Sequence, residues 1–329
     1  MLEISQKALC SMSQTNSTKT SVIKKLTIAS RESALALWQS EYIKARLEAL
    51  YPNLTVNING MTTQGDKILD VPLAKIGGKG LFVKELETAI IQGQADIAVH
   101  SMKDVPMEFP EGLELAVICE RENPFDAFVS NNFQNIDDLP KGAVVGTSSL
   151  RRHSQLISQR PDLAVKSLRG NVNTRLAKLD AGEFDAIILA ASGLMRLGFH
   201  DRIKSTLTAK QSLPAVGQGA LGLECRSADA AIKTLLAPLS HQESEFCVRA
   251  ERAMNQYLHG GCQVPIAGYA TLDHDTLTLN GLVASLDGKT VITACQQANT
   301  GNAEQLGITV AKELLEKGAG PLLEAVFEQ

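Results

Sequence analysis

The feature that most constrains the fold of this chain is an alternation, from Leu26 onward, of short apolar runs with longer stretches of helical periodicity. LTIAS (26–30) precedes a helix-like stretch that reaches Leu50, and LTVNI, a second helix-like stretch and ADIAVHS (95–101) follow. The same order resumes after Asn123 with DAFVS, AVVGTSS, LAVKSLRG and FDAIILAASG. Strands that alternate with helices predict βαβ units, so we expect two α/β domains.

A different order begins beyond His241. One helix-like stretch is followed by three strand-like runs (IAGYATLD, TLTLNGLVAS and KTVITACQQA) and a closing helix. Strands in immediate succession predict antiparallel pairing, so we expect a smaller α+β domain with a three-stranded antiparallel sheet.

The domain limits follow from two links, near 119–123 and 213–220, that resemble a paired crossover. We therefore expect the run LGLEC after Ala220 to return to the first domain. The expected parts are a disordered polar tail (1–22), domain 1 (23–119 and 220–239), domain 2 (123–216) and domain 3 (241–329).

Composition excludes several classes of protein. At 329 residues the chain exceeds the size at which one hydrophobic core usually divides. Its net charge of −4 gives no overall positive field for nucleic acid or a membrane surface, and no run approaches the roughly 18 apolar residues of a membrane span. The six cysteines are scattered without a CxxC pair, which favours a reducing cytoplasm and argues against a structural metal site.

Basic residues follow the predicted strands of both α/β domains at the point where each strand ends. The carboxyl ends of parallel strands border one crevice, and guanidinium groups pair bidentately with carboxylates. The pattern predicts a basic cleft for a ligand with several carboxylates. For any single cation the alternative is a solvated charge at the start of a helix. The residues are Arg31, Lys103, Arg151, Arg152, Arg169 and Arg196.

Asp104 and Cys262 each have more than one interpretation. Asp104, before Val105-Pro106, is either a turn residue or a carboxylate that moves protons and stabilises a transient cation. Cys262 lies in the turn-forming segment LHGGCQVPIAG, where only His259 is near enough in sequence to share a metal. Its residue chemistry leaves two functions open, an acyl-transfer nucleophile and a point of permanent covalent attachment.

Seven segments in this order give the chain a resemblance to a known family: ASRESALAL, VHSMKDVP, GTSSLRR, LRGNVNTRL, ASGLMRLG, PAVGQGALG and GGCQVPIA. They resemble the hydroxymethylbilane synthase (porphobilinogen deaminase) family over nearly the whole chain from about Leu26. One departure is Asn173, where the family pattern has glycine in LRGNVxTRL.

The resemblance implies a fold and a reaction. The first two domains are expected to resemble periplasmic binding proteins, and the third to carry Cys262, linked through a thioether to a dipyrromethane cofactor. Four porphobilinogen units add head to tail with loss of ammonia, and hydrolysis releases hydroxymethylbilane. Together with composition, we expect a cytoplasmic monomer that binds the small-molecule substrate porphobilinogen and has neither metal, nucleic acid nor membrane as partner.

The resemblance also implies residue roles. Asp104 and Lys103 are the expected catalytic pair, with Asp104 stabilising the azafulvenium cation that loss of ammonia leaves. The expected cofactor-binding residues are Cys262, Lys103, Asp104, Thr147, Ser149, Arg151 and Arg152. The expected substrate-binding residues are Arg31, Ser33, Phe82, Arg169, Arg175 and Arg196.

Two other functions compete with this interpretation. A non-catalytic two-domain binding protein could close on a carboxylated small molecule, but it would need neither a covalent anchor loop nor Asp104. A cysteine hydrolase would use a free thiol at Cys262, whereas the synthase carries that sulfur already bonded.

Overall fold

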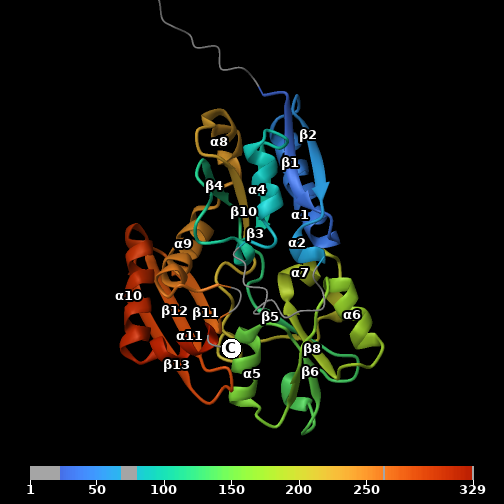
Figure 1. Ribbon diagram of the computed structural model, residues 1–329, viewed down its shortest axis with the longest axis vertical. Coiled ribbons are helices and arrows are strands. Elements are labelled where there is room, and N and C mark those ends of the chain that lie inside the picture. Colours follow the sequence, from blue (N-terminus) through green and yellow to red (C-terminus); the bar gives the residue numbers. More distant parts are fainter. Residues whose placement is uncertain (1–22, 68–79, 262–263, 328–329) are drawn as a thin grey trace, which may run out of the picture.

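The computed structural model describes residues 23–67, 80–261 and 264–327, which contain three β-sheets (Figure 1). The expected tail at 1–22 lies outside the described residues. The first sheet has the order β2-β1-β3-β10-β4 and forms the upper part of the view in Figure 1. Its strands are β1 (Lys25–Arg31), β2 (Thr55–Met61), β3 (Ile97–Ser101), β4 (Leu113–Ile118) and β10 (Leu221–Arg226).

The second sheet has the order β7-β6-β8-β5-β9 and lies at the lower right of Figure 1. Its strands are β5 (Asp126–Val129), β6 (Val144–Gly146), β7 (Ala164–Lys166), β8 (Ala186–Ala190) and β9 (Ser205–Thr206). In both sheets the βαβ strands run parallel, as expected, whereas β5 and β10 pair antiparallel with their neighbours. Each of these two strands enters its sheet directly after the chain crosses between the sheets, and the run LGLEC, expected to return to the first domain, lies in β10, which pairs with β3 and β4.

Most helices of these two parts start where a strand has just ended. Ser33, Ser149 and Asn171 cap three of them, because each side-chain oxygen accepts a hydrogen bond from a backbone N–H of the first turn. The helices are α1 (Ala34–Leu50), α2 (Gln64–Lys67), α4 (Lys84–Ile91), α5 (Leu150–Gln159), α6 (Val172–Asp180), α7 (Ala191–Arg196) and α8 (Ala230–Leu236), with short 3-10 turns η1 (Met102–Asp104), η2 (Ile136–Asp138), η3 (His200–Arg202) and η4 (Ala237–Leu239).

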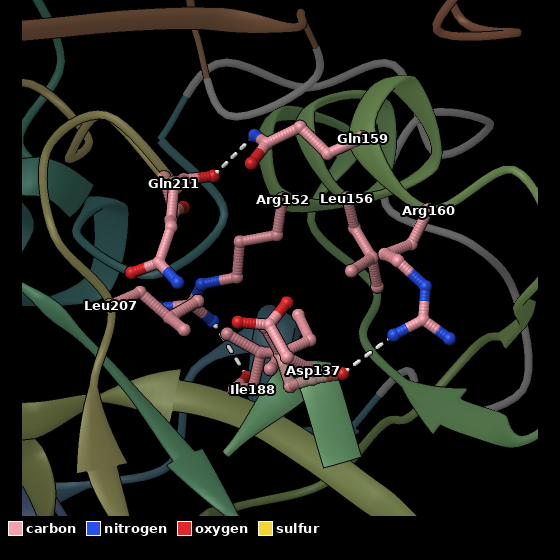
Figure 2. A pocket seen from close by; sticks show the side chains of 10 residues that line it. Asp137, Arg152, Leu156, Gln159, Arg160, Ile188, Leu207 and Gln211 are labelled. Carbon is pink, nitrogen blue, oxygen red and sulfur yellow. Dashed lines mark hydrogen bonds between the residues drawn. The ribbon is translucent and has the colours of Figure 1, made fainter. Parts of the chain in front are cut away.

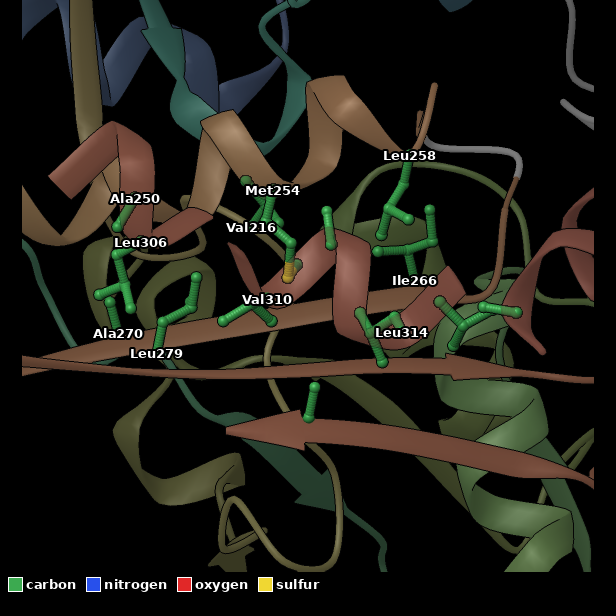
Figure 3. Close-up of a cluster of buried hydrophobic side chains, with 14 of the residues drawn as sticks. Val216, Ala250, Met254, Leu258, Ile266, Ala270, Leu279, Leu306, Val310 and Leu314 are labelled. Atoms are coloured by element: carbon green, nitrogen blue, oxygen red, sulfur yellow. The ribbon is translucent and has the colours of Figure 1, made fainter. Parts of the chain in front are cut away.

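The third sheet is antiparallel, with the order β11-β12-β13, which confirms the three strands expected from their succession in the sequence. Helices α9 and α10 pack on it, and Figure 3 shows the side chains they bury, among them Met254, Leu279, Val310 and Leu314. Full burial of such a side chain stabilises the fold by about 1.5–3 kcal/mol. The elements are α9 (Gln242–Tyr257), β11 (Ile266–Asp273), β12 (Thr276–Ala284), β13 (Val291–Asn299), η5 (Thr300–Asn302), α10 (Ala303–Glu316) and α11 (Ala319–Phe327).

The two segments that cross between the first and second sheets are attached to the third part of the molecule. Arg121, on the first segment, forms a buried ion pair of 2.6 Å with Glu251 of α9. Glu251 also accepts a hydrogen bond from the backbone N–H of Gly217, on the second segment. The three sheets therefore meet around these crossings. In the part of the chain that is described, no helix combines the length and the apolar character needed to cross a membrane.

Candidate active site

Basic side chains gather where the parallel strands end. Arg31 is the last residue of β1, Lys103 follows the end of β3 within η1, and Arg169 follows the end of β7. Arg151 and Arg152 are in the first turn of α5, which follows β6. The sequence placed these cations at strand ends, and the parallel pairing of β1 with β3 and of β6 with β7 and β8 puts those ends on one edge of each sheet.

Arg151 and Arg152 share a buried carboxylate, Asp126, the first residue of β5. Arg151 donates from both terminal nitrogens to Asp126, at 2.9 and 3.1 Å. Arg152 donates to the same side chain from Nε at 3.0 Å and from Nη2 at 2.8 Å. All three side chains are buried, so this is an internal ion triad and not a set of solvated charges.

Gln218 connects this triad to Lys103. Its amide nitrogen donates to Asp126 at 2.9 Å, and its amide oxygen accepts from Arg152 and from Lys103 Nζ, each at 3.4 Å. Lys103 follows β3 of the first sheet, and Arg152 follows β6 of the second sheet. The Gln218 amide therefore connects groups that come from the two sheets. We call Lys103, Asp126, Arg151, Arg152, Ser212 and Gln218 the junction cluster.

Burial and neighbouring charges shift the pKa values of two members of the junction cluster, Asp126 and Lys103. Burial alone would raise the pKa of Asp126, but the guanidinium groups of Arg151 and Arg152 outweigh burial and hold that pKa well below its ordinary range. Burial, reinforced by repulsion from Arg152, lowers the pKa of Lys103 to about 8, against the opposing attraction of Asp104 and Asp126. Below that pH three cations face the single carboxylate of the cluster, and above it two arginines still do.

Asp104 lies at the end of η1, half-buried, between cations. It favours the charged forms of Lys103 and of Arg175, which shows that its carboxylate is within electrostatic range of both. Burial, together with repulsion from Arg152 and Arg169, lowers the pKa of Arg175 to about 10. Asp104 is thus a carboxylate with cationic neighbours.

Arg31 and Phe82 lie together on the side of the first sheet. The Arg31 guanidinium is 4.4 Å from the centroid of the Phe82 ring and forms an ion pair with Asp66. Burial would raise the pKa of Asp66, but hydrogen bonds from Arg31 and Thr63 lower it. Ser33, two residues after Arg31, accepts from the backbone N–H of Ala36 at 3.4 Å. Its hydroxyl thus caps α1.

The remaining expected residues are spread over the second sheet. Arg196, at the end of α7, donates to the Gly219 carbonyl at 2.6 Å and lies 5.9 Å from the Trp38 ring. Thr147 is buried directly after β6, where its hydroxyl accepts from the backbone N–H of Ser149. Arg169 is half-buried, next to Gly170.

Asn173 does not disturb the start of α6. Asn171 caps this helix by accepting from Thr174 N at 2.9 Å, and Asn173 is exposed. Arg175 donates from Nε to the Gly170 carbonyl at 2.8 Å. The expected glycine is therefore not needed for the helix to begin here.

Cys262 lies outside the described residues, as does its neighbour at 263. On its flanks, the Val264 N–H donates to the Gly261 carbonyl at 3.3 Å. A Cβ at Gly260 would lie 2.1 Å from the Asn255 side chain, whereas one at Gly261 would meet nothing within 4 Å. Upstream, Arg252 of α9 donates to the carbonyl of Pro106 at 2.8 Å, so this helix docks just beyond Asp104.

A cavity of about 220 Å³ adjoins the junction cluster, and Arg152 and Ser212 of that cluster line it. Figure 2 shows the side chain of Arg152 reaching through it from α5 toward Ile188, whose carbonyl accepts from Arg152 Nη1 at 3.2 Å. Arg160, at the other end of α5, also lines the cavity and pairs with Asp162 at 2.8 Å.

Sequence reasoning missed Asp126, Gln218, Ser212 and Asp66. Asp126 and Gln218 are 92 residues apart in the chain, and no local pattern shows that they meet. The one signal was indirect, because Gln218 belongs to a segment identified as a link between domains, and Asp126 starts the strand-like run that follows the other link. Within the described residues no group of three His, Cys, Asp or Glu side chains could hold a metal ion.

The described residues suit a cofactor that carries several carboxylates. Lys103 and Arg175 have lowered pKa values, partly because other cations stand near them, and an added anion would relieve that repulsion. The pyrrole rings of a dipyrromethane cofactor carry acetate and propionate groups. The guanidinium groups of Arg151 and Arg152 can pair with such carboxylates.

Several solved structures resemble the chain weakly. The methionine-binding protein MetQ is 12% identical over 71% of this chain and 94% of its own, with a TM-score of 0.43. A putative methionine-binding lipoprotein of Bacillus subtilis is 12% identical over 67% and 92%, with a TM-score of 0.41. Lipoprotein Tp32 of Treponema pallidum is 11% identical over 65% and 90%, with a TM-score of 0.42. Because these scores are low, the description of the fold rests on its own sheets.

Two family models match the sequence. The model described as "Porphobilinogen deaminase, dipyromethane cofactor binding domain" matches residues 26–234, and the model described as "Porphobilinogen deaminase, C-terminal domain" matches residues 245–316. Together they cover most of the chain, including the described strands of the three sheets except Lys25, the first residue of β1. The chain therefore belongs to the porphobilinogen deaminase family and is an enzyme that condenses porphobilinogen into hydroxymethylbilane on a dipyrromethane cofactor.

Proposed function

We propose that the junction is where this enzyme holds its cofactor, with Cys262 as the covalent attachment point. Arg151, Arg152 and Lys103 would pair with carboxylates of the dipyrromethane, and Thr147 and Ser149 would add hydroxyl donors. The observation that carries this proposal is the concentration of buried cations around one carboxylate, Asp126. The cofactor supplies a terminal pyrrole with a nucleophilic α-carbon.

A second set of residues would receive porphobilinogen and the growing chain. Arg31, Arg169, Arg175 and Arg196 are guanidinium groups suited to acetate and propionate side chains. Phe82, against the Arg31 guanidinium, offers an aromatic face near the incoming ring. Ser33 offers a hydroxyl next to it.

Asp104 would be the catalytic carboxylate, supported by Lys103. Loss of ammonia from the substrate's aminomethyl group creates positive charge, and a site lined with arginines would oppose it. A carboxylate placed among these cations stabilises that charge and can accept and return a proton at a pyrrole nitrogen. Asp104 is in range of Lys103 and Arg175, which fits this task.

The remaining assignments concern the whole chain. We assign three domains, 23–119 with 220–239, 123–216 and 241–329, in line with the three sheets. We also propose a cytoplasmic monomer that binds porphobilinogen and neither nucleic acid nor metal. Free thiols support the reducing compartment, since Cys119, Cys225, Cys247 and Cys295 form no disulfide among the described residues. No observation favours the alternative of a non-catalytic binding protein.

Arg152→Leu tests the cofactor assignment. We expect the variant to fold but to load little or no cofactor, because one of the two guanidinium groups at the junction is lost. Loading is read from the intact mass of the denatured chain. Arg160→Leu is the matched control, since Arg160 is at the opposite end of the same helix, and it should load fully. A fully loaded Arg152→Leu variant would show that this arginine does not hold the cofactor.

A further inference from the structure

The carboxylate of Asp126 is the most heavily hydrogen-bonded charge in the described part of the site. Its side chain is fully buried and accepts from both nitrogens of Arg151 and two nitrogens of Arg152. It also accepts from Ser212 Oγ at 2.8 Å and from Gln218 Nε2 at 2.9 Å. None of these contacts was expected from the sequence.

Helix geometry explains why this carboxylate matters for the arginine pair. Consecutive residues on a helix point roughly 100° apart, so Arg151 and Arg152 have no intrinsic tendency to present their guanidinium groups side by side. Two buried guanidinium groups also repel each other, and each would be costly to bury without a counter-charge. Asp126 resolves both problems, because one carboxylate bonds to both groups and leaves the triad with a single net positive charge.

We propose that Asp126 is a positioning residue that holds Arg151 and Arg152 side by side and charged before any ligand carboxylate reaches them. The proposal rests on the proposed function, in which these two arginines bind the cofactor. Other contacts complete the arrangement, since Arg151 also donates to the Leu213 carbonyl at 2.7 Å and Arg152 to the Ile188 carbonyl at 3.2 Å. Asp126 would act through the arginines and would not touch the reacting atoms.

The same arrangement gives the proposal a pH signature. The charged groups that act on Lys103 are Arg152 and Arg151, which disfavour its ammonium form, and Asp104 and Asp126, which favour it. Removing the Asp126 charge leaves two arginines and one carboxylate, so the ammonium should lose its proton at a lower pH. If the ammonium helps to hold the cofactor, the decline of loading on the basic side should move to lower pH as well.

Cofactor loading of the full-length chain tests the proposal. Wild type, Asp126→Asn and Asp162→Asn are expressed in cells that cannot make porphobilinogen, and each is then incubated with porphobilinogen across a pH series. The adduct is followed by the intact mass of the denatured chain. We expect Asp126→Asn to load at least about 10-fold more slowly and to lose loading at lower pH than wild type. Asp162→Asn removes the Asp–Arg pair at the other end of α5 and should match wild type.

Two further variants separate the possible failures. If Asp126→Asn loads at the wild-type rate with the wild-type pH dependence while Arg152→Leu fails to load, the positioning role is wrong and the cofactor assignment stands. If Arg152→Leu loads fully, the proposed function fails. Should Asp126→Asn not fold, Ser212→Ala replaces it, since it removes one hydrogen bond to Asp126 without changing charge. We expect it to load several-fold more slowly, and wild-type loading of that variant would overturn the proposal.

Discussion

Asp104 is a carboxylate whose surroundings are cationic, and those surroundings decide what it can do. Lys103 precedes it and Arg175 lies within electrostatic range. If Asp104 only ended a turn before Pro106, it would not need a cation such as Lys103 or Arg175 beside it. In the proposed function the cations bind the carboxylates of the pyrroles, and Asp104 stabilises the positive charge that forms when ammonia leaves.

Asp104→Ala is expected to separate binding from chemistry. The variant should remain folded and keep its covalent adduct, because the cations that hold it are unchanged. Turnover of porphobilinogen should fall by about 10²-fold or more, the usual loss when a positioned acid–base group is removed. The measurement pairs intact mass with an assay of product formation. Asp201→Ala, at an exposed site, is the control, and normal turnover in Asp104→Ala would refute the assigned role.

Helix α4 carries a buried carboxylic acid, Glu87, which has no role in the proposed reaction. Glu87 faces the buried pair formed by His100 of β3 and Glu224 of β10, whose Nε2 and Oε2 atoms are 2.7 Å apart. Burial, together with the charge of Glu224, raises the pKa of Glu87 from 4.5 to about 7. The folded protein therefore keeps a proton on Glu87 at pH values where the unfolded chain has lost it.

This difference predicts the pH dependence of stability. Between the unfolded pKa near 4.5 and the folded pKa near 7, the folded state binds more protons, so the free energy of unfolding should decrease as pH rises. Glu87→Gln should flatten that slope. Urea unfolding at intervals from about pH 5 to about pH 8 measures it, with exposed Glu111→Gln as the control. Equal slopes in wild type and Glu87→Gln would contradict the assignment.

The turn between β12 and β13 docks on α5, the helix that carries the arginine pair. Gly288, in this turn, has φ of +67°, and a Cβ there would lie 2.6 Å from Ile157 and 2.9 Å from the Ser154 carbonyl. A side chain at this position would therefore be strained in the backbone and would also clash with the helix. The turn between β12 and β13 therefore packs against α5, whose first turn carries Arg151 and Arg152 of the proposed cofactor site.

Two glycine variants distinguish strain from clash. Gly182→Ala, where φ is +77° and no atom lies within 4 Å, should cost about 1 kcal/mol of unfolding free energy, the price of the left-handed backbone alone. Gly288→Ala should cost about 3 kcal/mol, because overpacking against α5 adds to the same strain. Urea denaturation measures both. Equal losses in the two variants would show that the turn does not press on the helix.

At the scale of the whole molecule, the features that could be predicted from the sequence are those that local patterns determine. The alternation of strands and helices, the return of β10 to the first sheet and the antiparallel third sheet all follow from periodicity and order along the chain. The antiparallel setting of β5 and β10, and the meeting of Asp126 with Gln218, depend on contacts between distant segments that no local pattern contains. The cationic character of the candidate site was visible in the sequence, whereas Asp126, the carboxylate that pairs with both Arg151 and Arg152, was not.

The central claim is that this enzyme carries a permanently attached dipyrromethane on the sulfur of Cys262. Its most direct test is the intact mass of the freshly purified, denatured chain, followed by mapping of the modified peptide. We predict an increase equal to two linked pyrroles, located at Cys262. A bare polypeptide with a free thiol at Cys262, and no linear tetrapyrrole formed on incubation with porphobilinogen, would contradict it.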